Sequence, residues 1–380
     1  MPGMTYQVLQ ADARRLPLDD NSVDLVVTSP PYFALRAYKG GGGNLEGQIG
    51  GEPSSEGFLE ALWDVAAESW RTLADSGSLW VNLGDRFDKN HATANGSGSG
   101  EVRTKSLMGL PWRYALGMIE DNGHAGGQWI LRGEVIWEKT NGLPESATDR
   151  TIRKHEHWFH FVKEEVYFSA ADVLRRFDPS TGDLGSMPTS VWRIPTEGIR
   201  NIPDGHIKHY AAFPPELPRR IILGWSPSGH CLECGQPRVP KVGREFTGDY
   251  NEKEAQRQKA RSGVRAGGLK STLGRTTSVT RRFQGEECGC STTDSPTRPS
   301  VVLDPFGGTG TTAAVAHHLG RHGISVDLSP EYNRLARWRI KGDERLRARV
   351  LEATYGDNSL LGWWDTQQRA QETGSNGCDA

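Results

Sequence analysis

The sequence predicts an α/β protein built on one open, mostly parallel sheet with helices on both faces. Two apolar runs, at residues 23–27 and 301–303, are typical of buried parallel strands, and a distinctive loop follows each at once. These loops are residues 28–32 (TSPPY) and residues 304–312 (DPFGGTGTT). Ligands of open α/β sheets bind on loops that leave the carboxyl ends of strands. Both loops are therefore candidate functional sites.

The order of these loops constrains the topology. The second loop leaves only residues 313–380 after it, too few for the rest of a doubly wound sheet at ordinary element lengths. We therefore expect one sheet assembled from both ends of the chain, with a helix at residues 58–74. Further apolar runs that predict strands lie at residues 4–9, 78–83, 133–137 and 158–162.

The second loop has the pattern of a nucleotide-binding turn. Gly308, Gly310 and Ala313 fit G-x-G-x-x-A, in which missing side chains allow a tight turn and a close approach of the backbone to a nucleotide. An apolar helix at residues 311–319 and a second short strand follow, and that strand ends at Asp327. A carboxylate about 20 residues past the glycines is placed to accept hydrogen bonds from both hydroxyls of a ribose. Asp327 is thus the expected ribose ligand.

The first loop suits chemistry on a base amine. Pro30 and Pro31 fix φ and remove backbone donors, so the loop presents the Pro30 carbonyl and the Ser29 hydroxyl as acceptors beside the Tyr32 ring. An exocyclic amino nitrogen is a poor nucleophile because its lone pair is conjugated into the base. Two acceptors on its N–H bonds favour pyramidal geometry and return electron density to the nitrogen, while Tyr32 stacks on the base. Attack on a sulfonium methyl group then needs mainly alignment.

These motifs resemble those of the β class of amino-group DNA methyltransferases, in which the catalytic loop precedes the cofactor loop. The resemblance extends over nearly all of residues 5–340. It implies a Rossmann-like, S-adenosylmethionine-dependent methyltransferase sheet with circularly permuted motif order, acting on a base flipped out of the duplex. The implied catalytic residues are Ser29, Pro30, Pro31 and Tyr32. The cofactor ligands would be Asp12, Asp304, Phe306, Gly307, Gly308, Thr309, Gly310, Thr311 and Asp327. The base pocket would comprise Phe33, Trp137, Lys139, Asn141 and Pro144.

The resemblance also bears on which base is modified. Family members with Ser before Pro-Pro-Tyr mostly methylate the 4-amino group of cytosine, and those with Asp or Asn mostly methylate the 6-amino group of adenine. Ser29 therefore favours cytosine, with adenine as the alternative. Two other classes stay open at this point: a nicotinamide-dependent oxidoreductase that uses the glycine loop, and a catalytically silent DNA-binding module that retains the fold.

The same resemblance divides the chain into segments. We expect a catalytic half at 1–167, a target-recognition region at 168–208, a return segment at 209–230, a cysteine-bounded basic insertion at 231–298, a cofactor half at 299–345, and a C-terminal helix end with a polar tail at 346–380. The net charge of −2 requires any DNA-binding surface to be local. Candidate DNA contacts in the recognition region are Arg175, Arg176, Arg193 and Arg200.

The basic insertion carries a cysteine pattern of its own. Residues 238–282 hold twelve Lys or Arg against four Asp or Glu, with almost no apolar pattern, so we expect them not to fold alone. They either lie along DNA phosphates or form a solvated insertion. Two pairs, Cys231-x-x-Cys234 and Cys288-x-Cys290, flank the stretch and suit a tetrahedral zinc site. Free thiols are the alternative, since a disulfide is unexpected in a reducing cytosol.

The remaining expectations concern location and partners. No apolar run reaches membrane-spanning length, and no signal peptide is visible. We expect a cytoplasmic protein of a bacterial or phage-infected cell that acts on double-stranded DNA without a membrane partner, as a monomer or a homodimer. A cognate restriction endonuclease is a candidate partner.

Overall fold

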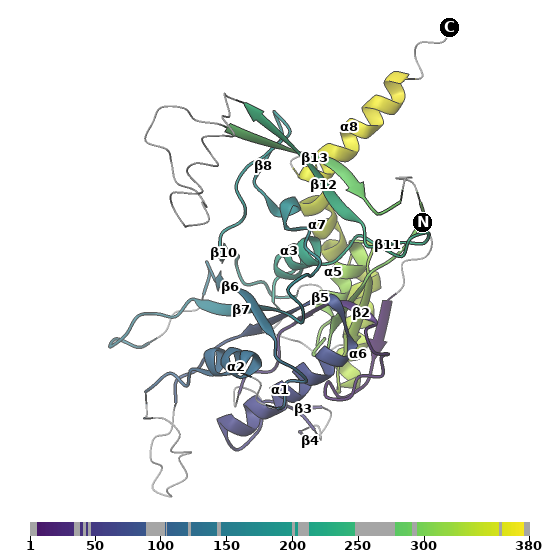
Figure 1. Ribbon diagram of the computed structural model, residues 1–380. Helices are drawn as coiled ribbons and strands as arrows, with labels where there is room; N and C mark the ends of the chain where they lie inside the picture. The colour runs from purple at the N-terminus through teal and green to yellow at the C-terminus, as the bar shows by residue number, and fades with distance from the viewer. Residues whose placement is uncertain are drawn as a thin grey trace, which may run out of the picture.

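The structure is a computed structural model, and its central element is an eight-stranded sheet (Figure 1). The strand order is β1-β16-β15-β2-β5-β7-β6-β10. The strands are β1 (Tyr6–Leu9), β2 (Val23–Thr28), β5 (Leu73–Leu83), β6 (Ile130–Glu138), β7 (His155–Val162), β10 (Val191–Arg193), β15 (Val301–Asp304) and β16 (His322–Val326). The residues described are 6–33, 39–40, 43–44, 47–88, 103, 105–120, 123–142, 146–199, 202–203, 213–247, 278–290, 295–356 and 359–375.

Both ends of the chain contribute to this sheet, which confirms the predicted α/β class and the permuted order. β15 and β16 lie between β1 and β2, and β15 pairs in parallel with β2 through Val302 opposite Leu25 and Leu303 opposite Val26. The neighbours from β1 to β5 are all parallel, whereas β7 is antiparallel to both β5 and β6. The short strand β10 was not predicted; it extends the sheet by pairing with β6.

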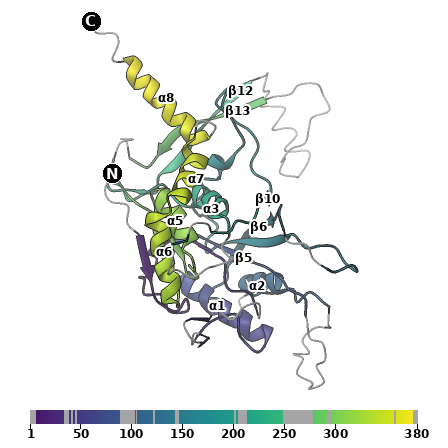
Figure 2. The same cartoon turned by 180° about the vertical axis from the view of Figure 1, so that it is seen from behind.

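Helices cover both faces of the sheet, as the views in Figures 1 and 2 show. α1 (Ser55–Thr72) and α2 (Leu110–Ile119) pack on one face, and α3 (Glu216–Trp225) and α5 (Thr311–His318) pack on the other. Successive strand residues point to opposite faces, so Val26 joins the core beneath α1 while Leu25 and Val27 join the core beneath α3 and α5. α6 (Pro330–Gly342) and α7 (Glu344–Tyr355) follow β16 and extend the second helical layer.

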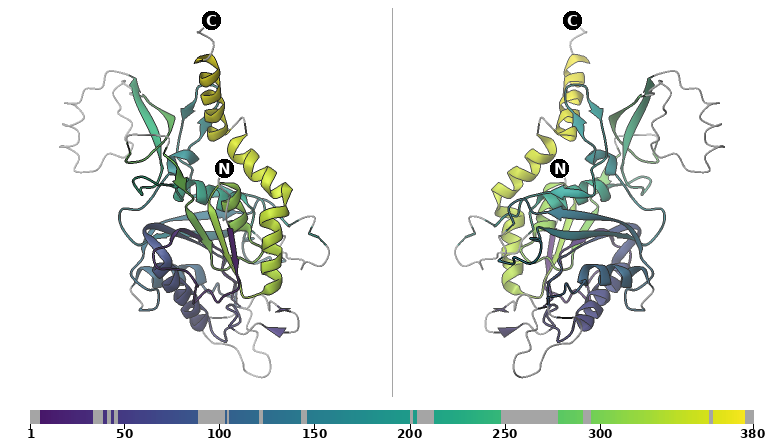
Figure 3. Two further views of the ribbon diagram at one scale, coloured as in Figure 1. Left: turned by 90° about the vertical axis from the view of Figure 1, so that its right-hand side faces the viewer. Right: turned by 90° about the vertical axis from the view of Figure 1, so that its left-hand side faces the viewer.

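A second, smaller sheet joins segments that the sequence analysis treated separately. β8 (Phe177–Asp178) and β9 (Asp183–Leu184) come from the predicted recognition region, and they align with β12 (Val239–Thr247) and β13 (Ser278–Glu287) in the order β12-β13-β9-β8. The hairpin β12–β13 and α8 (Leu360–Ser375) project from the same end of the molecule (Figure 3). α8 packs there through Trp363 against Phe177 and Trp364 against Phe283.

Two regions thus hold more regular structure than their composition indicates. The ends of the basic insertion are strands because Phe283 finds an apolar partner on α8, while residues 248–277 lie outside the described residues. The C-terminal region 346–380, expected to hold a helix end and a polar tail, contains most of α7 and all of α8. The remaining short elements are β3 (Lys39–Gly40), β4 (Gly43–Asn44), a 3-10 turn at Ala171–Leu174, β11 (His230–Cys231) and β14 (Thr297–Arg298).

Within the described parts of the chain, every helix is too short or too polar to cross a membrane.

Candidate active site

The two predicted loops lie side by side at the carboxyl edge of the sheet, and one buried carboxylate joins them. Asp304 is 1% exposed and accepts hydrogen bonds from Thr28 Oγ1 at 2.7 Å and Thr312 Oγ1 at 2.9 Å. Thr28 immediately precedes the catalytic loop, and Thr312 lies in the first turn of the helix after the cofactor loop. Thr28 is therefore hydrogen-bonded to a residue 276 positions away in sequence, and the same carboxylate holds the helix after the cofactor loop.

Asp304, for which the resemblance implies a cofactor contact, is a buried acid that joins the two loops. Burial raises the pKa of its carboxyl to about 6, although hydrogen bonds from Thr28, Thr312 and the Phe306 N–H oppose the shift. The side chain is not among the residues that line the cavity between the loops. Asp304 therefore orients the two loops.

A cavity of about 460 Å³ lies between the loops, within the range of small-molecule sites. It brings together predicted catalytic, cofactor and base-pocket residues: Asp12, Ser29, Pro30, Pro31, Tyr32, Trp137, Lys139, Phe306, Gly307, Gly308, Thr309, Thr311 and Asp327. The geometry therefore assembles one site from both halves of the chain.

Asp327 lies at the cofactor end of the cavity. Its Oδ2 accepts from the Gly308 N–H at 3.0 Å, and its Oδ1 accepts from the Ser329 N–H at 2.8 Å. Burial raises the pKa of the carboxyl to about 6 despite these two hydrogen bonds. Each carboxylate oxygen keeps a lone pair beyond the one used here, so the group can accept two further hydrogen bonds from a ligand.

The glycines of the cofactor loop are required by close packing. A Cβ on Gly307 would lie 2.0 Å from Ser325 Oγ, and one on Gly310 would lie 2.7 Å from the Ala336 Cβ. Gly310 also has φ +74°, in the left-handed region that favours glycine. Gly310 does not line the cavity, so its place in the motif reflects the packing of α5 against α6.

Asp12 lines the cavity on the other side of the cofactor end. Its carboxylate accepts from Arg14 Nη2 at 2.7 Å and from the Arg14 N–H at 2.9 Å. Partial burial would raise the pKa of Asp12, but the hydrogen bonds and charge of Arg14 lower it below its usual value. The group is thus an ionised acceptor held rigidly at the cavity wall.

The catalytic loop is positioned by a residue that the sequence analysis did not single out. Asn82 lies on β5, is 1% exposed, and its Oδ1 accepts from both Ser29 Oγ and Tyr32 Oη at 3.1 Å. Its amide orientation is fixed because Nδ2 donates to the His157 backbone carbonyl, which can only accept, at 3.1 Å. The Ser29 hydroxyl proton therefore points at Asn82, and its lone pairs stay available as acceptors.

Space for the Tyr32 ring comes from Gly84, which directly follows β5, the strand that carries Asn82. A Cβ on Gly84 would lie 2.8 Å from Tyr32 Cε2, so only glycine lets the ring occupy this position. The clue in the sequence was a polar Asn82 within an apolar strand, followed closely by Gly84.

The predicted base-pocket residues separate into three groups. Trp137 and Lys139 line the cavity, where the Lys139 ammonium lies 4.9 Å from the centre of the Trp137 ring. Asn141 does not line the cavity. Its Oδ1 accepts a hydrogen bond at 2.7 Å from the N–H of Thr196, which does line it. Phe33 points into the core against Phe58, with ring centres 5.4 Å apart, because its side chain faces away from the loop.

Pro144 lies outside the described residues. The sequence analysis also missed Glu156, which lines the cavity and forms an ion pair with Lys139. Its position on β7, between aromatic and histidine residues, gave no separate signal.

The arginines proposed to contact DNA differ in availability. Arg175 forms an ion pair with Asp172 and donates to the Gly185 carbonyl at 3.0 Å, which makes it a structural residue of the small sheet. Arg193 pairs with Glu138 at 2.9 Å, yet its side chain is 75% exposed. Arg176 is exposed, and Arg200 lies outside the described residues.

The fold and the cavity bring a glycine loop, with Asp327 after it, against the Ser-Pro-Pro-Tyr loop, which is the arrangement expected of an amino-methyltransferase. Comparison with known families agrees. The DNA methylase family of N6 and N4 enzymes matches residues 23–231 and 292–337. The chain belongs to this family, and it is an S-adenosylmethionine-dependent DNA amino-methyltransferase.

Particular relatives match over nearly the whole chain. The chain is 30% identical to the Type II methyltransferase M.XycI of Xanthomonas campestris pv. cyanopsidis, covering 90% of this chain and 88% of that protein. It is 29% identical to the Type II methyltransferase M.Cfr9I of Citrobacter freundii, with the same coverage. Among solved structures, the PvuII DNA methyltransferase (cytosine-N4-specific) superposes with a TM-score of 0.53 at 18% identity, covering 94% of this chain and 95% of that one, which shows a shared fold.

Proposed function

We propose that this chain methylates the 4-amino group of cytosine, flipped out of double-stranded DNA, as the modification enzyme of a type II restriction-modification system. The observation that carries the proposal is the neutral acceptor pair at the catalytic loop: the Pro30 carbonyl and a Ser29 hydroxyl whose proton is directed to Asn82. The cytosine-N4 specificity in the name of the PvuII structure and the Type II designation of the relatives support it.

The residues at the cofactor end fit S-adenosylmethionine. Gly307 and Gly308 present side-chain-free backbone to the cavity, while Asp327 and Asp12 offer ionised acceptors at its wall. Asp327 would accept the ribose hydroxyls, and Asp12 would accept from the adenine amino group. When bound, the cofactor supplies a methyl group on a sulfonium centre, which is electrophilic without further activation.

The catalytic loop prepares the amine. The Pro30 carbonyl and Ser29 Oγ accept the two N–H bonds of the base, so the nitrogen lone pair is freed from the ring. Tyr32, held by Asn82 and accommodated by Gly84, stacks on the base and limits its rotation. The cofactor would supply the methyl group to this nitrogen with loss of its bond to sulfur, and Ser29 Oγ and the Pro30 carbonyl would hold the proton that the nitrogen then releases to water. Alignment supplies most of the acceleration.

The cavity also holds a donor suited to the acceptor atoms of the base. Lys139 is held between Glu156 and the face of Trp137, so its ammonium has a defined direction. The Trp137 ring is itself fixed because its Nε1 donates to the Ile194 carbonyl at 2.7 Å. We infer that Lys139 donates to the acceptor atoms on the pairing edge of the flipped cytosine.

Digestion of methylated DNA to nucleosides tests the base. DNA treated with the chain and S-adenosylmethionine carrying a labelled methyl group should release N4-methyldeoxycytidine on mass spectrometry. Label in N6-methyldeoxyadenosine would overturn the choice of cytosine while leaving amino methylation intact. No label in either nucleoside would favour the silent DNA-binding alternative.

The biological setting is part of the same proposal. We infer that the enzyme acts in the bacterial cytoplasm and that a cognate endonuclease cleaves the same sequence. Sequencing DNA from expressing cells would give the modified site. Resistance of that DNA to an endonuclease from the same genome would support the pairing.

A further inference from the structure

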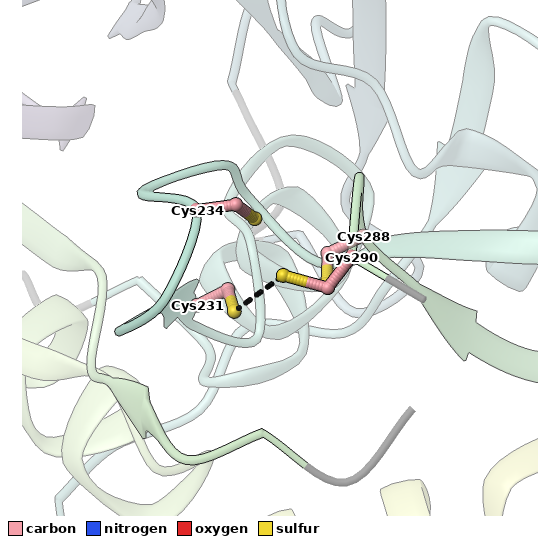
Figure 4. A group of neighbouring side chains, drawn as sticks. All are labelled: Cys231, Cys234, Cys288 and Cys290. Atoms are coloured by element: carbon pink, nitrogen blue, oxygen red, sulfur yellow. Dashed lines mark hydrogen bonds between the residues drawn. The ribbon is translucent and has the colours of Figure 1, made fainter. Parts of the chain in front are cut away.

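The four cysteines at the base of the basic insertion come together in space, although 53 residues separate the two pairs. Cys231 and Cys234 lie at and after β11, and Cys288 and Cys290 follow β13. Their sulfur atoms all lie within 4.8 Å of one another, and Cys231 Sγ is 3.5 Å from Cys290 Sγ. Figure 4 shows the four side chains directed toward a common centre from two separate segments.

These distances fit a metal better than a disulfide. Zinc–sulfur bonds of about 2.3 Å in a tetrahedron place the sulfurs about 3.8 Å apart. A disulfide requires about 2.05 Å, and these cysteines are free thiols. Four thiolates without an oxygen ligand are a soft donor set that selects zinc among common divalent ions. We propose that Cys231, Cys234, Cys288 and Cys290 bind one structural zinc ion.

The first pair lies on a turn that backbone hydrogen bonds hold in shape. The Gly235 N–H donates to the Cys231 carbonyl, and the Cys231 N–H donates to the Gln236 carbonyl, both at 2.9 Å. Gly235 has φ +71°, which a side chain would strain. β11 also pairs with β14, just beyond the second cysteine pair. The ligand-bearing segments are therefore held near each other before a metal binds.

The site lies far from the reaction. His230, adjacent to Cys231, is not a ligand because its Nε2 faces Asp24 Oδ1 at 2.8 Å. Asp24 is the second residue of β2, whereas Ser29 follows the end of that strand. At about 3.3 Å per residue, the strand separates these points by about 17 Å. Zinc here cannot take part in methyl transfer.

Its effect is to close the insertion at its base. The ends of the hairpin β12–β13 would be joined through one ion, which fixes where the basic segment leaves the body of the protein. That segment carries twelve Lys or Arg and four Asp or Glu between residues 238 and 282. Its role in holding DNA phosphates rests on the proposed function, whereas metal binding does not.

Metal content of the full chain, purified without added metal, is the primary test. We expect one zinc ion per chain by plasma mass spectrometry. Cys231→Ser and Cys290→Ser should each lose the zinc, while the matched control Cys378→Ser should retain it. S-adenosylmethionine binding should persist in all three variants, which shows that the main fold is intact.

Wild-type protein alone decides the question if the serine variants fail to fold. Exchange of zinc for Co²⁺ should give the visible absorption of a tetrahedral cobalt–thiolate site. Zinc-free wild-type chain with thiols that all react at once, or with disulfides on mass spectrometry, would overturn the proposal.

A separate measurement of DNA affinity tests whether the zinc ion positions the basic segment. Loss of zinc should weaken DNA binding by about tenfold at low salt, in the manner expected when phosphate contacts are misplaced. Unchanged DNA affinity in a zinc-free variant would remove the proposed link between the ion and the basic segment, and zinc content would still decide the site itself.

Discussion

The two loops of the cavity are held in place by different means. Close backbone packing adds to side-chain hydrogen bonds in the cofactor loop: Gly307 and Gly310 leave no room for a Cβ beside Ser325 and Ala336, and Arg339 donates to the Thr309 carbonyl at 3.2 Å. Side chains fix the catalytic loop: Ser29 and Tyr32 both donate to Asn82, which is 53 and 50 residues away from them. The difference teaches that the position of the cofactor loop depends on close backbone approach, while the position of the catalytic loop depends on the distant Asn82 amide. Substitutions in the two regions should therefore separate kcat from cofactor affinity.

The largest effect is expected at the support of the catalytic loop. Asn82→Ala removes the shared acceptor of Ser29 and Tyr32, so both groups lose their orientation. We expect kcat to fall about 100-fold, as for a small misplacement of reacting groups. The dissociation constant for S-adenosylmethionine should stay within about twofold, since this loss involves no cofactor contact. Single-turnover methylation and calorimetric binding measure the two quantities.

The control for this prediction is Asn82→Asp, which keeps an acceptor for Ser29 and Tyr32 but loses the donor to the His157 carbonyl. It should retain more activity than the alanine variant. Equal losses in kcat for both variants would contradict the assigned role.

Substitution of Asp327, the proposed ribose ligand, should weaken cofactor binding and leave kcat nearly unchanged. Asp327→Ala removes a carboxylate that would accept charged hydrogen bonds, each worth about 1.5–3 kcal/mol. We expect the cofactor dissociation constant to rise about 30-fold, with kcat at saturating cofactor nearly unchanged. A fall in kcat that excess cofactor does not restore would show that Asp327 acts on the reaction as well.

Substitution of Asp304, which joins the two loops, should lower kcat and cofactor affinity together. Asp304→Ala removes the acceptor of the buried Thr28 hydroxyl and one of the two acceptors of the Thr312 hydroxyl, which keeps the Val27 carbonyl at 3.2 Å. We expect the free energy of unfolding to fall by about 3 kcal/mol, and kcat and cofactor affinity each to fall about tenfold. Denaturant unfolding measures the stability. A change in kcat alone, or in cofactor affinity alone, would show that Asp304 supports only one of the two loops.

The smallest effect is a pH dependence of cofactor affinity. The pKa of Asp327 is raised to about 6, so the carboxylate is ionised above this value and protonated below it. The ionised form is the better acceptor, and affinity should therefore fall as pH falls. If only the ionised form binds, the dissociation constant should be about fourfold higher at pH 5.5 than at pH 7.5. Asp327→Asn should flatten this dependence. The remaining slope would then reflect Asp304, whose pKa is also raised to about 6.

Part of the site could be predicted because its signals are local. Glycines in a fixed spacing identify the cofactor loop, and two prolines before Tyr32 identify the catalytic loop. The parallel strands that precede both are short apolar runs. Asp327 follows from its distance to the glycines. Such patterns reflect steric rules that act over a few residues.

Other residues could not be placed in this way. Phe33 follows Tyr32 directly, yet it faces the core, while Asp304 begins the cofactor motif but binds Thr28 and Thr312. Glu156 lies among aromatic residues and reaches the cavity only because β7 runs antiparallel beside β5 and β6. These outcomes depend on which strands become neighbours.

By itself, the sequence determined the α/β class, the permuted order of the two loops and the paired cysteines, because each depends on residue type and short spacing. Only the tertiary structure decided that Asn82 supports the catalytic loop, that Asp304 joins both halves, and that β9 pairs with β13. The physical reason is that a buried hydrogen bond needs two partners in contact. No sequence pattern in the residues between two such partners indicates that the partners will meet.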